Sequence, residues 1–290
     1  MPEVAGRPLP LSTTLLASLA MLAFAGNSVL CRLALAETQI DAVSFTVLRI
    51  ISGALLLWAL LARRKRSRAK AGNWAGALAL TVYAAAFSFA YIQLDTGVGA
   101  LLLFGAVQLS MLLFGLLRGE RLGAAATAGL ILAMAGVVAL LLPGSSAPPL
   151  MSSLVMLLSG LAWGAYSLLG RSTRDPLAST ADNFLRSIPL VLLAALPFLD
   201  QVHWDTTGAL LAVLSGAVTS GLGYAIWYSA LRGLGSIQAA SIQLSVPILA
   251  AAAGMLLFSE PLTPRVLIAA AAVLGGLTLV LKARNLKSRA

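Results

Sequence analysis

Aromatic residues at helical spacing are the first side chains in this sequence that could hold a ligand. Tyr83, Phe87 and Tyr91 recur every four residues, and Trp163 precedes Tyr166 by three, so a helix would place each set on one face. A third set comprises Tyr224, Trp227 and Tyr228. Ring faces stack on aromatic or bulky apolar molecules, and they attract an ammonium group. These residues therefore indicate a site for a small apolar or amine-bearing molecule.

Polar side chains inside apolar runs form a second group. Its members are Asn27, Ser28, Gln93, Gln108, Ser167 and Gln243. Amides and hydroxyls in hydrocarbon must find hydrogen-bond partners. They could bind a zwitterionic ligand, or they could join one helix to the next. The pattern favours the structural interpretation and leaves the binding interpretation open.

Arg49 and Arg186 each lie about two turns inside an apolar run. A cation at that depth costs about 3 kcal/mol or more unless a carbonyl or an anion accompanies it. The two arginines lie equally deep, one measured from each face of the membrane. This symmetry favours a structural role in which each arginine anchors one of two similar halves of the chain. Binding of a substrate carboxylate by Arg49 is the alternative.

Patterns for catalysis are missing from the sequence. A phosphate-binding loop needs G-x-x-x-x-G-K-[ST], which does not occur. A single histidine, His203, and a single cysteine, Cys31, allow neither a Ser-His-Asp set nor a His/Cys metal cluster. We therefore expect a protein that is not an enzyme and that uses no cofactor or metal.

The apolar runs that carry these residues indicate that the solvent is a lipid bilayer. Hydrophobic residues make up 59% of the 290 residues and charged residues only 10%, with a mean hydropathy of +0.93. A soluble domain carries roughly 25% charged residues. A helix of about 20 apolar residues crosses the hydrocarbon core. Ten such spans are predicted, over 12–35, 42–62, 74–92, 97–117, 121–142, 151–169, 177–199, 208–231, 236–258 and 263–281.

Aromatic residues at span ends have an ordinary explanation at the lipid–water interface. This explanation is favoured for Trp58, Trp74, Trp204, Trp227 and Tyr228. Tyr83 and Trp163 fall near the middle of their spans, where an interface belt does not account for them. Cavity lining and helix packing are equally supported for these two residues.

The basic residues predict the orientation of the chain. With the N-terminus inside, 16 of the 20 Lys and Arg residues fall in cytoplasmic segments, including the cluster within 63–70. Both termini are then cytoplasmic, which is typical of a multi-pass protein of a bacterial-type inner (plasma) membrane. The net charge of +10 is spread over short loops between spans, so we expect no nucleic-acid partner.

Acidic residues lie in loops or near span ends, and Asp182 reaches furthest inward, about one turn into its span. A proton or sodium path normally needs an acid at membrane depth. The sequence therefore predicts gradient-driven transport rather than obligate proton exchange through a buried carboxylate. Titration of His203 or Asp95 in a loop is the alternative.

The two halves of the chain resemble each other. Ser28, Leu30 and Arg32 align with Ser167, Leu169 and Arg171, and Leu48-Arg49 aligns with Leu185-Arg186. Each half holds five spans, and because five is odd the second half enters the membrane upside down. We expect a first five-helix repeat over 11–142, a second and inverted repeat over 151–282, and a cytoplasmic tail over 283–290. An inverted-topology repeat is typical of a transporter.

Small residues complete the pattern. Gly115-xxx-Gly119 and Gly160-xxx-Gly164 predict close helix packing. Gly97, Gly99, Gly221 and Gly223 are candidate flex points, and Pro189 and Pro247 are candidate kinks within spans.

Specific residues carry a family resemblance. They are the Gly119-Glu120 and Ser259-Glu260 loops, Arg49, Arg186, Trp163, and the stretch 95–100 followed by Gln108. Over about 12–282 the chain resembles the EamA-type ten-helix exporters of the drug/metabolite transporter superfamily. Within that family it is most similar to the YddG type, which exports aromatic amino acids. Phe24 stands where the family often has Trp, and Val107 stands where it often has Pro.

Residues and resemblance together predict an all-α integral membrane transporter that exports aromatic or neutral amino acids, or similar metabolites, by alternating access. The expected binding residues are Asn27, Tyr83, Phe87, Gln108, Trp163, Tyr224 and Gln243. Another cargo, such as a drug, a nucleotide sugar or a sugar phosphate, is the first alternative. A non-transporting membrane scaffold is the second. The expected partners are the lipid bilayer and a small-molecule substrate, while the oligomeric state stays open and is compatible with a monomer.

Overall fold

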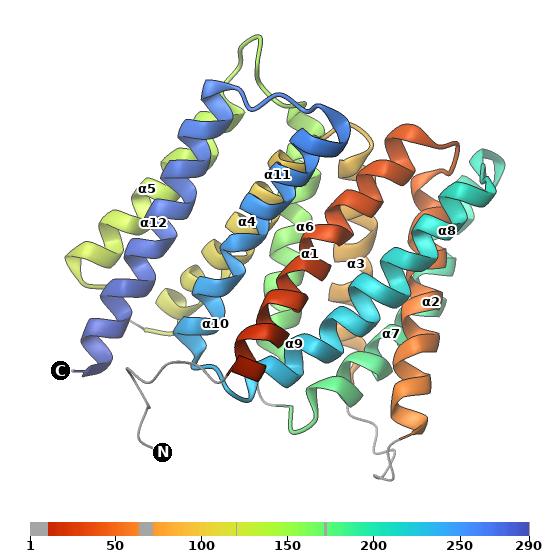
Figure 1. Cartoon of the computed structure of the whole chain (residues 1–290), viewed down its shortest axis with the longest axis horizontal. Helices are drawn as coiled ribbons and strands as arrows, with labels where there is room; N and C mark the ends of the chain where they lie inside the picture. The colour runs from red at the N-terminus through yellow and green to blue at the C-terminus, as the bar shows by residue number, and fades with distance from the viewer. Residues whose placement is uncertain (1–10, 64–71, 120, 171–172, 290) are drawn as a thin grey trace.

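The computed structural model describes residues 11–63, 72–119, 121–170 and 173–289, and every element in these ranges is helical (Figure 1). Ten helical spans are long and apolar enough to cross a membrane, which confirms the predicted number. The first half forms α1 (Leu11–Glu37), α2 (Ala42–Ala62), α3 (Trp74–Tyr91), α4 (Thr96–Leu117) and α5 (Ala124–Leu141).

Spans in the second half are less regular. After α6 (Leu150–Gly170), the seventh span comprises α7 (Pro176–Ala195) and the 3₁₀ turn η1 (Leu196–Gln201). The eighth comprises α8 (Thr206–Leu214), the π-helical segment η2 (Ser215–Leu222) and α9 (Gly223–Leu231). The ninth comprises α10 (Ser236–Gln243) and α11 (Ser245–Phe258), and α12 (Pro264–Arg289) completes the chain.

Helix starts follow from short polar side chains in the loops. Asp41, Asn73, Asp175 and Asp205 each precede a helix in extended backbone and accept a hydrogen bond from an amide of its first turn. Such caps satisfy amide groups that the helix itself leaves without a partner. Asp41 also accepts from the backbone amide of His203, which ties the turn before α2 to the turn before α8.

Breaks in the eighth and ninth spans have identifiable causes. Pro247 has no amide hydrogen to give to the carbonyl of Gln243, and α10 ends at that residue. The π-helical η2 lies mid-span and contains Gly216 and Gly221, and π-helical turns are frequent at functional sites. Two of the predicted flex points, Gly221 and Gly223, therefore lie in and directly after an irregular segment.

Helices α5 and α12 pack along each other at one edge of the molecule, away from α2, α7 and α8 (Figure 1). Several other contacts between the halves come in matched pairs. The α3–α6 contact matches that of α1 with α9, and the α4–α6 contact matches that of α1 with α11. The contact of α2 with η2 matches that of α7 with α3. A pseudo-twofold relation between two five-span halves would produce this pairing.

Glycines permit close approach at several of these contacts. A Cβ atom added to Gly160 would lie 2.5 Å from the Cβ of Ala106, so the predicted close packing at Gly160 and Gly164 is confirmed, and the structure shows that the partner helix is α4. The prediction for Gly119 is wrong. This residue has φ of 87°, meets no neighbouring atoms, and ends α4 in the left-handed conformation that glycine favours.

The α5–α12 contact supplies a test of the packing. Gly276 faces α5, where an added Cβ would lie 2.7 Å from the backbone nitrogen of Ala133, whereas a Cβ on the adjacent Gly275 would meet nothing within 4 Å. We expect Gly276→Ala to lower stability by about 1–3 kcal/mol because it overpacks two backbones. The measurement is the melting temperature in detergent.

Gly275→Ala is the matched control. It adds the same methyl group to the exposed face, so its melting temperature should be unchanged or slightly raised. Equal destabilisation by both substitutions would contradict the packing described here.

Candidate functional site

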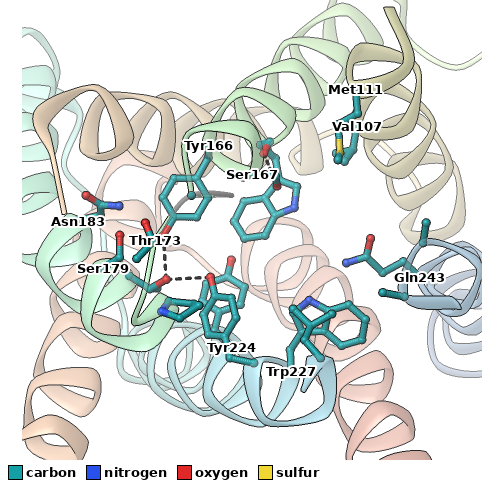
Figure 2. A pocket seen from close by; sticks show the side chains of 18 of the residues that line it. Val107, Met111, Tyr166, Ser167, Thr173, Ser179, Asn183, Tyr224, Trp227 and Gln243 are labelled. Atoms are coloured by element: carbon teal, nitrogen blue, oxygen red, sulfur yellow. Dashed lines mark hydrogen bonds between the residues drawn. The ribbon is translucent and has the colours of Figure 1, made fainter. Parts of the chain in front are cut away.

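A cavity of about 340 Å³ lies between α4, α6, α7, α9 and α10. It extends to the ends of α6 and α9 near Gly170 and Leu231, which are the ends where the sequence predicts the cytoplasm. Its described lining contains rings, amides, hydroxyls and apolar groups but no charged side chain. Figure 2 shows Gln243 and Trp227 on one side of this cavity, with Tyr166 and Asn183 on the opposite side.

A second, much smaller chamber of about 20 Å³ lies deeper in the molecule. Asn27, Ser28, Tyr83 and Phe87 line it. Three residues line both spaces, and they are Trp163, Tyr224 and Gln243. The small chamber has room for about one water molecule, so in this state only the larger cavity can hold a metabolite.

Trp163 forms the centre of the wall between the two spaces. Its ring centroid lies 4.6 Å from that of Tyr83, 5.2 Å from that of Tyr224 and 5.3 Å from that of Tyr166. The rings of Tyr224 and Tyr166 are stacked on it, at interplanar angles of 26° and 29°. The stack joins α3, α6 and α9, and it offers ring faces and edges to a flat ligand.

All seven binding residues expected from the sequence line the larger cavity, the small chamber or both. Asn27 also has a structural task, because its Oδ1 accepts hydrogen bonds from the hydroxyls of Ser215 at 2.7 Å and Thr219 at 3.1 Å. These bonds join α1 to the π-helical segment. Because all seven residues line these two spaces, they are candidates for substrate binding. Their contact with a ligand stays a prediction.

The interface-belt interpretation is wrong for Trp227 and Tyr228. Both line the cavity, and Trp227 is only 7% exposed. Their spacing of three and four residues from Tyr224 already placed all three on one face, and that signal should have outweighed their position near a span end. In contrast, Trp58, Trp74 and Trp204 are exposed, as the belt interpretation predicts.

Sequence reasoning missed the contribution of α7. Thr180 accepts a hydrogen bond from the hydroxyl of Tyr166 at 3.0 Å and shares another with Tyr228 at 2.8 Å. Asn183 also lines the cavity, and its Oδ1 accepts from the backbone amide of Asn73. The first turns of the seventh span contain the polar pairs Ser179-Thr180 and Asp182-Asn183, which were the available signal.

The two intramembrane arginines differ in their surroundings. Arg186 forms an ion pair with Asp182 at 3.3 Å and lies over the ring of Trp74, and Asp182 also accepts from the amide of Gly72. These contacts fit the predicted anchoring role. Arg49 is only 2% exposed, and its contacts are with rings rather than with a carboxylate.

At the opposite ends of the helices, a polar network around Arg32 links several spans. Its Nε lies 3.4 Å from Glu260, and its Nη1 donates to the backbone carbonyls of Tyr91 and Ile92. Glu260 in turn accepts from the backbone amide of Thr96 at 2.8 Å and from its hydroxyl at 3.0 Å. The network thus ties α1, α3, α4 and the end of α11 together.

Comparison with known proteins identifies the family. The model of the EamA-like transporter family matches residues 11–142 and 150–282. The chain belongs to the EamA-like transporter family. It is therefore a multi-pass membrane transporter, and the resemblance inferred from the sequence is confirmed at this level.

Relatives of this EamA-like transporter share most of its length. It is 62% identical to an uncharacterized protein of Pseudomonas aeruginosa over 273 residues, covering 94% of this chain and 95% of the relative. It is 26% identical to an uncharacterized transporter of Archaeoglobus fulgidus, covering 82% of this chain and 86% of the relative. A solved crystal structure shares the fold, with a TM-score of 0.67 at 21% identity, covering 95% of this chain and 99% of that one.

Glu260 belongs to the Ser259-Glu260 loop that first suggested the family. Burial raises the pKa of this carboxyl, and the negative charge of Asp95 adds to the rise, while the hydrogen bonds from Thr96 and the charge of Arg32 oppose it. Glu260 therefore takes up a proton at a higher pH than an ordinary glutamate does. The neutral acid loses its charge attraction for Arg32, so we expect acid to weaken the contact between Arg32 and Glu260.

We expect Glu260→Gln to separate the ends of α1 and α11. The amide removes the charge that Arg32 contacts and leaves a group of nearly the same size. The measurement is the distance between spin labels on cysteines placed at the exposed positions Glu37 and Leu257, in a Cys31→Ser background. Acidification of the unsubstituted protein should shift the distances in the same direction.

Asp95→Asn is the control for this experiment. Its carboxylate is 40% exposed and lies 3.8 Å from Arg32, so solvent screens the pair and its loss should change little. Identical distances in the Glu260→Gln and unsubstituted proteins at every pH would contradict the role given to this network.

Proposed function

We propose that this transporter exports aromatic and other neutral amino acids, or similar small metabolites, by alternating access. One observation carries the proposal. An uncharged, ring-lined cavity is open at one end of the bundle, while at the other end the Arg32–Glu260 network links four spans. A carrier stopped at one stage of its cycle has this asymmetry.

The chemistry of the lining supports the cargo. Rings of Trp163, Tyr224 and Tyr166 offer stacking faces, and the amides of Gln108 and Gln243 can both donate and accept hydrogen bonds. A volume of about 340 Å³ lies in the range of small-molecule sites. A neutral molecule with an apolar body and a few polar atoms fits these properties.

A phosphate-bearing cargo is disfavoured by the same lining. Phosphate recognition normally uses several arginines or lysines converging on the ligand. No basic residue lines the described part of the cavity. A hydrophobic drug would find the same rings but would leave the amides unused, so the amino-acid proposal accounts for more of the site.

Matched contacts between the halves support alternating access. If the halves are inverted repeats, each contact on the open side has a counterpart that can form when that side closes. Under this proposal the cavity faces the cytoplasm in the present state, both termini are cytoplasmic, and the membrane is a bacterial-type plasma membrane. Export as the net direction follows from the family resemblance.

The test is counterflow in proteoliposomes with labelled phenylalanine, tryptophan, tyrosine and small neutral amino acids at equal internal and external pH. We expect exchange of at least one of them, reduced about tenfold or more by Trp163→Ala, because that change removes the centre of the ring stack. Size-exclusion profiles check that the variant is folded.

Trp204→Ala is the matched control, since this Trp is 67% exposed and lies in the loop before α8, outside the cavity. It should exchange substrate like the unsubstituted protein. Absence of counterflow with every amino acid, in folded protein, would contradict the proposed cargo. Equal loss in both Trp variants would contradict the proposed site.

A further inference from the structure

Arg49 lies in the membrane interior without an acidic partner among the described residues. Its Nη2 donates to the hydroxyl oxygen of Tyr83 at 3.0 Å, its guanidinium lies 4.8 Å from the ring centroid of Phe87, and its Nη1 is buried with no hydrogen-bond partner. A cation at this depth is costly unless it is neutralised. The matching arginine of the second half, Arg186, has Asp182 for this purpose.

Tyr83 connects this cation to the small chamber. Its ring lines the chamber, and its oxygen already accepts from Arg49, so its own O–H remains free to donate. A hydrogen bond received from a cation polarises the phenol and makes that O–H a stronger donor. Arg49 does not line the chamber itself, but its positive charge strengthens the hydrogen bond that the Tyr83 hydroxyl can donate into it.

Two more hydroxyl donors line the same chamber. The hydroxyl oxygen of Ser220 on η2 is buried and has no hydrogen-bond partner, and that of Ser28 on α1 is buried beside the hydroxyl of Tyr91. Buried polar groups without partners are rare and call for an explanation. Three hydroxyl-bearing residues line a space of about 20 Å³, a buried cation is hydrogen-bonded to one of them, and their donors would match the acceptor oxygens of one small anion.

We propose that the small chamber is the subsite for a substrate carboxylate, with Tyr83, Ser28 and Ser220 as its donors and Arg49 as the positioning residue that supplies charge through Tyr83. This inference rests on the proposed transport function and narrows its cargo to carboxylates. The chamber adjoins the larger cavity at Trp163, Tyr224 and Gln243. An aromatic body in the larger cavity would therefore direct its carboxylate past Trp163 as the ring moves aside.

Ligand-induced stabilisation tests the proposal without any transport. The melting temperature of the purified protein is measured against concentration for three probes: phenylalanine, 3-phenylpropionate and phenylalaninamide. We expect both carboxylates to bind at least about tenfold more tightly than the amide. Loss of one charge-assisted hydrogen bond is of that size.

Four variants test which residues cause the preference for a carboxylate over an amide. Arg49→Gln and Tyr83→Phe should reduce the ratio of carboxylate to amide affinity about tenfold, and Ser220→Ala should reduce it less. Arg186→Gln is the matched control, because it removes an intramembrane arginine that does not line either space. It should keep the full ratio even where its melting temperature falls.

The ratio of carboxylate to amide affinity distinguishes a loss of carboxylate recognition from a loss of folding. If Arg49→Gln does not fold, Tyr83→Phe and Ser220→Ala still test the donors, since neither alters the buried charge. Equal binding of acid and amide by the unsubstituted protein, binding of neither carboxylate, or an unchanged ratio in the folded variants overturns the proposal. Failure of amino-acid counterflow together with an intact carboxylate preference would instead overturn only the amino-acid cargo.

Discussion

The stack of Trp163 on its neighbouring tyrosines is the interaction on which the arrangement of this transporter depends. It joins the third, sixth and eighth spans, so both halves of the chain contribute to it. It also separates a cavity large enough for a metabolite from a chamber with room for one water molecule. Movement of one indole ring would therefore change both the size of the site and its access to polar groups.

Polar groups at the two ends of the molecule have opposite arrangements, and this difference follows from the solvent. In hydrocarbon every buried donor needs a partner. At the end opposite the cavity, Arg32, Glu260 and Thr96 satisfy one another and hold four spans together. At the cavity end the hydroxyls of Tyr166, Thr180 and Tyr228 are linked, while the Gln243 amide faces the cavity. The polar groups opposite the cavity bond to one another, whereas the cavity end also presents groups that a ligand can use.

Much of the fold was predictable because the bilayer imposes a length on each span. The second span was predicted at its observed bounds, and the other membrane spans differ by at most three residues at either end, although the helix of the last span continues to Arg289. The division of the eighth span by a π-helical segment was not predictable, since its residues Ser215 and Thr219 bond to Asn27, a partner 188 and 192 residues away that periodicity does not reveal. The break after Gln243 was foreseeable from Pro247, which was expected only to kink its helix.

The candidate site was predictable for rings near the middle of a span and less so near its ends. Tyr83 and Trp163 were singled out because an interface belt could not explain them. Trp227 and Tyr228 were assigned to the belt because depth was considered before helical face. The roles of Glu260 and Thr180 arise from partners distant in sequence, at separations of 228 and 48 residues for Arg32 and Tyr228, which periodicity does not reveal.

The central claim is that the site opens to one side of the membrane at a time. Gln243 lines both spaces, and Cys31 is the single native cysteine. The most direct measurement is therefore labelling of Gln243→Cys, in a Cys31→Ser background, by a membrane-impermeant maleimide applied to either side of oriented vesicles. The account predicts labelling from the cytoplasmic side, and conditions that open the outer side should increase outer labelling while inner labelling falls. Simultaneous labelling from both sides, with no reciprocal change, would contradict it.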